Sequence, residues 1–146
     1  MNKVLFRAEE LPMPPYKDEL ELFILRVLDR LGKKNWEVSV LFCSNRYIKS
    51  LNAQYRNKDE PTDVLAFPLG EKNPAGIYLA GDIVISLDAL EENTRYFDVP
   101  SGDELRRLLV HGILHLSGMD HATNKAGEPM LETQEEILAA LTEKTT

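Results

Sequence analysis

Three histidines, the only ones in the chain, lie within one short stretch, HGILHLSGMDH. They are His111, His115 and His121, and Gly118 stands between the second and the third. Histidines four residues apart on a helix project from the same face, so His111 and His115 can reach one ion. His121 can join them only where the helix has ended, and Gly118 permits the left-handed turn that this requires. Three nitrogen ligands without a fourth protein ligand are typical of a catalytic zinc site, in which water takes the open position.

The residue after the first histidine distinguishes zinc proteases from other hydrolases with such a site. Zinc proteases with this ligand spacing carry a glutamate there as general base, whereas this chain has Gly112. A zinc protease is therefore the weaker alternative. A purely structural zinc is another, but such sites usually include cysteine, and the single cysteine, Cys43, lies far away in the sequence. We predict one catalytic Zn²⁺, although three imidazoles also accept nickel and copper.

A second group of polar residues lies in the segment NAQYRNKDEPTDVLAFP, at residues 52–68. Arg56 and Lys58 lie where a predicted helix gives way to a strand, a place where functional side chains are common. The planar guanidinium of Arg56 suits a phosphate or a carboxylate. The alternative is a structural arginine paired with Asp59 or Asp63, and the residues alone leave both roles open.

Three aspartates are further candidates for the same site. Asp120 adjoins His121, and a carboxylate beside a metal-bound histidine often accepts its free N–H. Asp63 and Asp82 lie in predicted strands, where a structural role at a cap or a sheet edge is an equal alternative.

The composition is that of a soluble globular protein, with 43% hydrophobic and 28% charged residues among 146. One cysteine excludes an internal disulfide and suits a reducing compartment. No stretch approaches the ~20 apolar residues of a membrane span. We therefore expect a cytoplasmic protein that forms one domain over residues 1–146 and has no membrane partner.

The net charge of −7 argues against non-specific binding to nucleic acid, and we expect no DNA partner. Two basic groups nevertheless allow a local binding cleft. They are Arg46, Lys49, Arg56 and Lys58, and then Arg95, Arg106 and Arg107. The alternative is that these side chains lie on solvated helix faces.

Hydrophobic spacing and turn residues indicate the elements that must hold these side chains. We predict strands over residues 3–7, 36–42, 63–67 and 78–85. Predicted helices carry the apolar residues of 20–31, 48–55, 105–116 and 130–141, and another follows residue 86. Ser44 and Ser86 are predicted N-caps, and Ser101 and Glu104 a predicted capping box. Pro68 is expected to close the third strand.

The element order β-α-β-α-β-β-α-α-α places the strands early and the helices late, which favours an α+β fold. We expect a single domain with a small mixed β-sheet packed by helices, and the histidine-bearing helix in the core. The third and fourth strands are close enough in sequence to form a hairpin with a long loop. The order of the strands in the sheet cannot be derived from the pattern.

Four segments together resemble the YbeY-type endoribonucleases, a family of bacterial ribosomal-RNA maturation factors. They are residues 52–68, GDIVI at 81–85, the histidine window at 111–121 and residues 130–138. The histidine window combined with YRNKDEPTDVLAFP is highly specific, because neither motif is common and both occur in the family's order. The first fifty residues add little identity.

The resemblance implies a single metal-dependent endoribonuclease domain with one Zn²⁺ on His111, His115 and His121. It implies cleavage of single-stranded ribosomal RNA, particularly at the 3′ end of the small-subunit RNA, and a role in ribosome quality control with the small subunit as partner. It marks Arg56 and His111 as catalytic. Arg56, helped by Lys58, would bind the substrate and neutralise charge that develops on its phosphate.

The chain departs from the family pattern at two positions. Met119 stands where the family usually has tyrosine, and Ala66 where it usually has serine, so the shape of the pocket is affected rather than the class of reaction. With Gly112 in place of a glutamate, the proton acceptor is open between the substrate phosphate, a nearby carboxylate and zinc hydroxide. The alternatives in function are a zinc metalloprotease-like hydrolase and a non-catalytic ribosome-assembly factor with a structural zinc.

Overall fold

The computed structural model describes residues 1–119 and 129–143. Its strands are β1 (Lys3–Glu9), β2 (Trp36–Cys43), β3 (Val64–Lys72) and β4 (Tyr78–Ser86). Its helices are α1 (Lys17–Arg30), α2 (Asn45–Arg56), α3 (Leu87–Phe97), α4 (Ser101–Leu116) and α5 (Pro129–Glu143). The predicted element order and the α+β class are confirmed.

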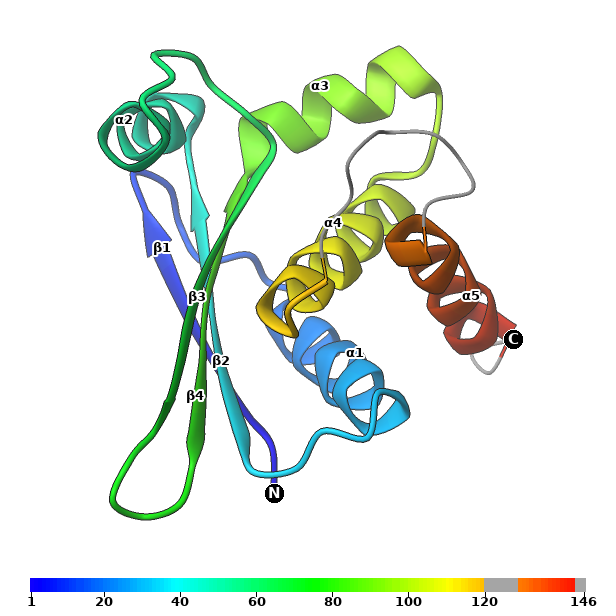
Figure 1. The fold of residues 1–146 in the computed structure, drawn as a ribbon. Helices are drawn as coiled ribbons and strands as arrows, with labels where there is room; N and C mark the ends of the chain where they lie inside the picture. The colour runs from blue at the N-terminus through cyan, green and yellow to red at the C-terminus, as the bar shows by residue number, and fades with distance from the viewer. Residues whose placement is uncertain (120–128, 144–146) are drawn as a thin grey trace.

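The strands form one mixed sheet in the order β1-β2-β4-β3 (Figure 1). β1, β2 and β4 run parallel, and β3 is antiparallel to β4. β2 pairs with β4 rather than with β3, which follows it in the sequence, and this is why the pattern of elements alone could not give the order. β4 lies inside the sheet, and β3 is an edge strand.

Helices cover the two faces of the sheet unequally, with α1, α4 and α5 on one side and α2 on the other (Figure 1). The alternation of side chains in β2 explains both layers. Val38 and Phe42 are fully buried in the larger core beneath α1 and α4. Leu41 and Cys43 point to the opposite face, where they pack with Ile48 of α2.

α4, which carries two of the three histidines, is buried along most of its length. Its apolar residues Leu109, Ile113 and Leu114 have no exposed surface, and the helix contacts α1, α3 and α5 as well as β3 and β4. The prediction of a histidine-bearing helix in the core is confirmed, and this helix gives the site a rigid support.

The predicted helix starts are confirmed at two positions and wrong at a third. The Ser44 and Ser86 hydroxyls each accept a backbone N–H from the first turn of their helices. α4, by contrast, begins after Pro100, whose carbonyl accepts the N–H groups of residues 103 and 104. Ser101 is therefore already helical and cannot act as the cap, and the Glu104 carboxylate accepts instead from Asn93.

The prediction that Pro68 closes the third strand is also wrong. β3 continues to Lys72, with an irregular register between Pro68 and Glu71. An edge strand tolerates proline because one side of its backbone needs no ladder hydrogen bond. The β3–β4 hairpin is confirmed, but its loop, residues 73–77, is shorter than expected.

Hydropathy is moderate throughout these helices. Within the described parts of the chain, none is long and apolar enough to span a bilayer.

Candidate metal centre

α4 ends in a turn that reverses the chain just after the second histidine. The N–H of Gly118 binds the carbonyl of His115, and the N–H of Met119 binds the carbonyl of Leu114. These two bonds form a Schellman motif, which requires a left-handed residue at its corner. Gly118 supplies it with a φ of 95°. The chain therefore leaves the helix at the point that the histidine spacing predicts.

His111 and His115 lie one turn apart on α4 with their rings directed at each other. Their Nε2 atoms are 3.1 Å apart, and the ring planes meet at 78°. Two nitrogens on one tetrahedral zinc, at bond lengths of ~2.0–2.1 Å, are separated by about 3.3 Å. The pair thus fits two adjacent ligand positions of a single ion.

The third predicted ligand, His121, and the neighbouring Asp120 lie outside the described residues. Within residues 1–119 and 129–143, no group of three His, Cys, Asp or Glu side chains could hold a metal ion. The three-histidine site therefore stays a prediction from the sequence. The geometry of His111 and His115 is compatible with it.

Gln134, on α5, is a polar residue of this site that sequence reasoning missed. Its Oε1 lies 2.8 Å from Nδ1 of His111, and the residue is only 6% exposed. The signal was present in the sequence, because Gln134 occupies the inward face of α5 between the apolar Met130 and Leu138. A lone amide among inward apolar positions needs a hydrogen-bond partner.

Gly112 is required by the close packing of α4 on the sheet. A Cβ at this position would lie 2.8 Å from Cγ2 of Ile83 in β4, and 3.1 Å from two further atoms of that side chain. Gly112 is buried, so a larger residue has no room. A glutamate base in the protease position would have to displace Ile83.

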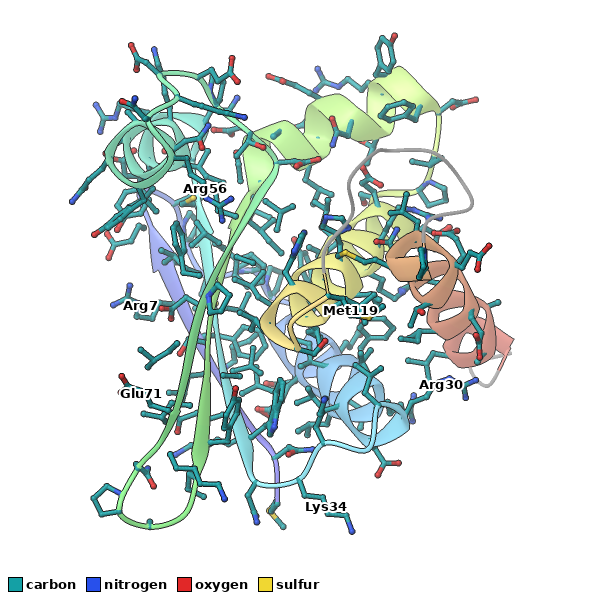
Figure 2. The ribbon with its side chains drawn as sticks, in the orientation of Figure 1. Arg7, Arg30, Lys34, Arg56, Glu71 and Met119 are labelled. Carbon is teal, nitrogen blue, oxygen red and sulfur yellow. The ribbon has the colours of Figure 1, made fainter. Side chains whose placement is uncertain are left out.

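The two histidines open onto a cavity of about 370 Å³. Its α4 side is formed by His111, Gly112, His115 and the turn at Gly118 and Met119. Its other side is formed by β3 from Val64 to Pro68 and by Arg56 at the end of α2. Figure 2 labels Arg56 and Met119, the two ends of this arrangement. The two positions at which the chain departs from the pattern that it resembles, Ala66 and Met119, both line the cavity.

Arg56 is exposed and is held mainly by β3. Its guanidinium donates to the carbonyl of Ala66 at 2.8 Å and lies 5.7 Å from the ring centre of Phe67. Among the described residues it makes no ion pair, so the predicted alternative of a structural pair with Asp59 or Asp63 does not hold. Most of its five N–H donors stay available to a ligand.

The remaining candidates lie away from the cavity. Lys58 is exposed in the loop after α2 and does not line the cavity. Asp63 accepts a hydrogen bond from Asn93, and Asp82 lies on the opposite face of the sheet, facing a separate groove. The structure thus gives Asp63 the structural role that the sequence left as an alternative.

Most of the basic residues predicted as a possible cleft are neutralised by carboxylates. The pairs are Arg46 with Glu10, Lys49 with Asp59, Arg95 with Glu91, Arg106 with Asp103, and Arg107 with Glu104 and Glu135. Their side chains lie on solvated faces, as the alternative had it. Arg56 and Lys58 differ, because neither makes an ion pair with another described residue.

The sequence and the fold of this chain are similar to those of known proteins. The family model described as Endoribonuclease YbeY matches residues 7–142. Proteins named Endoribonuclease YbeY are 52% identical in Treponema denticola, over 82% of this chain and 79% of theirs, and 45% identical in Treponema pallidum, over 95% and 89%. The solution structure of TM1509 from Thermotoga maritima is 31% identical, with a TM-score of 0.65 over 92% of this chain and 86% of that one. The chain belongs to the endoribonuclease YbeY family.

Proposed function

We propose that this endoribonuclease is zinc-dependent and cleaves single-stranded RNA in the cavity between α4 and β3. The zinc would be held by His111, His115 and His121, and Arg56 would bind the phosphate to be cleaved. The observation that carries the proposal is the presence, on opposite walls of one cavity, of two Nε2 atoms 3.1 Å apart and of the Arg56 guanidinium, which makes no ion pair with any described residue.

The residues divide the work of phosphodiester hydrolysis. The three histidines would hold the zinc, which would supply a water activated at neutral pH and a Lewis acid for a phosphoryl oxygen. Arg56 offers a planar donor pair that matches two phosphate oxygens, and its charge opposes the charge that develops on phosphorus in the transition state. Its bond to the Ala66 carbonyl uses one donor and orients the others. Lys58, outside the cavity lining, would contact a neighbouring phosphate of the RNA.

We further propose that the substrate is ribosomal RNA, that the cut contributes to maturation of the small-subunit 3′ end and to ribosome quality control, and that the small subunit is the partner. Family membership supports this part of the proposal. The cytoplasm, where ribosomes are assembled in bacteria, is then the place of action.

A peptidase function is disfavoured by the packing of Gly112. The general base of the zinc proteases occupies this position, and here Ile83 fills the space that its side chain would need. The family's ligand spacing is thus shared with proteases, whereas the base is excluded by the contact between helix and sheet.

The test is cleavage of a single-stranded RNA from the small-subunit 3′ end, with zinc content measured in each sample. We expect wild type to bind one zinc and to cut, Arg56→Ala to bind zinc without cutting, and His115→Ala to lose both. Lys49→Ala is a matched control, because Lys49 is a basic residue of the same helix whose partner is Asp59.

Each contrary result points to a different error. Full cutting by Arg56→Ala would remove the role of Arg56, and cutting by a zinc-free wild type would remove the metal. If zinc-loaded protein binds RNA and never cuts it, alone or with small subunits, the non-catalytic assembly factor is correct. Zinc-dependent cleavage of peptides in place of RNA would restore the protease alternative.

A further inference from the structure

Gln134 lies in a chain of polar contacts that runs from the protein surface to His111. The guanidinium of Arg107 in α4 donates to the carboxylate of Glu135 in α5. The same carboxylate oxygen, Oε2, lies 3.2 Å from Nε2 of Gln134, and Oε1 of Gln134 lies 2.8 Å from Nδ1 of His111. This series of contacts crosses the α4–α5 interface twice, and Gln134 is its buried member.

The acidic end of this chain fixes which way the Gln134 amide points. A carboxylate paired with arginine only accepts hydrogen bonds, so it must face the NH₂ group of the amide. Exchange of the amide's two ends would put its oxygen against the Glu135 carboxylate and break the hydrogen bond that the buried Gln134 donates. The carbonyl oxygen of Gln134 is therefore the atom that faces the imidazole.

The orientation of the amide in turn fixes the proton on His111. Because Oε1 of Gln134 can only accept, Nδ1 of His111 must carry the hydrogen. In a neutral imidazole the other nitrogen, Nε2, then has the lone pair. That is the nitrogen that faces Nε2 of His115 at 3.1 Å, where a metal would lie.

We infer that Gln134 is a positioning residue that holds His111 in the one tautomer able to bind metal through Nε2, and that Glu135 with Arg107 keeps the Gln134 amide in the required orientation. Its role rests on the zinc site proposed above. Nothing in the role needs Gln134 to touch zinc or RNA. Partners of this kind typically change metal affinity by about 10- to 100-fold.

The experiment compares Gln134→Met with Gln134→Glu in the full chain. Methionine has a similar length and no acceptor of comparable strength, so Nδ1 of His111 loses its partner. Glutamate keeps an oxygen in the same place, and this variant is made together with Glu135→Gln, so that its second oxygen faces an NH₂ group instead of a carboxylate. We expect zinc affinity, measured by competition with a chelator, to fall about 10- to 100-fold in Gln134→Met and to stay within a few-fold of wild type in Gln134→Glu.

The tautomer is measured separately, by long-range ¹H–¹⁵N NMR of the histidines in chelator-treated protein. We expect the His111 hydrogen on Nδ1 in wild type and Gln134→Glu, and a population with the hydrogen on Nε2 in Gln134→Met. A merely structural role would alter stability without moving the hydrogen. Glu136→Gln is the control for Glu135→Gln, since it removes the same negative charge one residue further along α5, where the partner is Arg30.

Glu135→Gln tests the proposal at the exposed end of this series of contacts, where a substitution does not disturb the core. A glutamine at 135 can donate as well as accept, so the Gln134 amide is free to turn, and zinc affinity should fall by several-fold. Unchanged affinity and an unchanged tautomer in both Gln134→Met and Glu135→Gln would overturn the inference. If wild type binds no zinc, the proposed function fails, while the NMR measurement still decides whether Gln134 sets the tautomer.

Discussion

The α4 wall of the cavity is held by the core, whereas the wall made by α2 and β3 stands at an edge of the sheet and carries the exposed Arg56. His111 is fixed by Gln134 from behind, and Gly112 beside it touches Ile83. Arg56 is exposed and is the last residue of its helix, and β3 pairs with only one strand. Metal ligands must be placed within tenths of an ångström. An arginine that binds a long substrate must instead be exposed to it. The two walls suit these two tasks.

The largest effect should come from the α4 wall. We expect His111→Ala to abolish both zinc binding and RNA cleavage, because it removes a proposed ligand and takes away the imidazole that Gln134 contacts. Zinc analysis and a gel assay of RNA cleavage measure the two losses. Cleavage at the wild-type rate by the purified, zinc-free variant would show that the α4 wall is not the catalytic one.

Arg56→Ala and Arg56→Lys should separate charge from shape on the other wall. We expect loss of about 10²- to 10³-fold in kcat for alanine. Lysine should lose about 10- to 100-fold, because it keeps the charge and loses the planar pair of donors. Both variants should retain the Tm and the zinc content of wild type. A large fall in Tm would mean that this wall, too, is structural.

Gly112→Ala should lower stability by about 1–3 kcal/mol, since the new Cβ would lie 2.8 Å from Ile83. Denaturant unfolding measures the loss. The double variant Gly112→Ala with Ile83→Ala should lose less than the sum of the two single changes, because alanine at position 83 lacks all three atoms that the new Cβ would meet. Additive losses would show that Gly112 is needed for another reason.

Lys58→Ala should have a small effect, less than about 10-fold on KM and none on kcat. Lys58 is exposed and lies outside the cavity lining, and single exposed charges contribute little. Steady-state kinetics at two salt concentrations measures it. A loss as large as that of Arg56→Ala would extend the catalytic wall beyond the cavity.

The smallest change concerns the layer beneath α2. Burial, with further contributions from Glu10 and Asp88, raises the pKa of the Cys43 thiol to about 12. We therefore expect no reaction with a thiol reagent at pH 8 in the folded protein, and one reactive thiol after denaturation. Reaction of the folded protein would show that α2 moves away from the sheet and exposes Cys43.

The comparison also explains what the sequence could and could not predict. His111 and His115 can be predicted as a pair because four-residue spacing on a helix is a local property. Gly118 can be predicted because a helix end needs a left-handed residue. The meeting of Arg56 with the histidines depends on β3 lying at the edge beside β4, which no local pattern encodes. The same limit hid Gln134, whose partner lies on another helix.

Local rules failed where a neighbour in the chain or in the sheet overrode them. Ser101 was expected to cap α4, but the carbonyl of Pro100 already accepts its first hydrogen bonds. Pro68 was expected to end β3, but an edge position tolerates it. Lys58 follows Arg56 closely in the sequence but does not line the cavity, so its predicted contact with the substrate stays a prediction.

The division of the site between distant segments has a consequence for the order of events during synthesis. Arg56 leaves the ribosome before β4 exists to place β3, and His111 precedes Gln134, which belongs to the last helix. No fragment that ends before α5 contains both walls and the partner of His111. Under the proposed function, a chain that is still being translated lacks the complete site, so it would cut the messenger and the ribosomal RNA beside it less readily than the finished protein does.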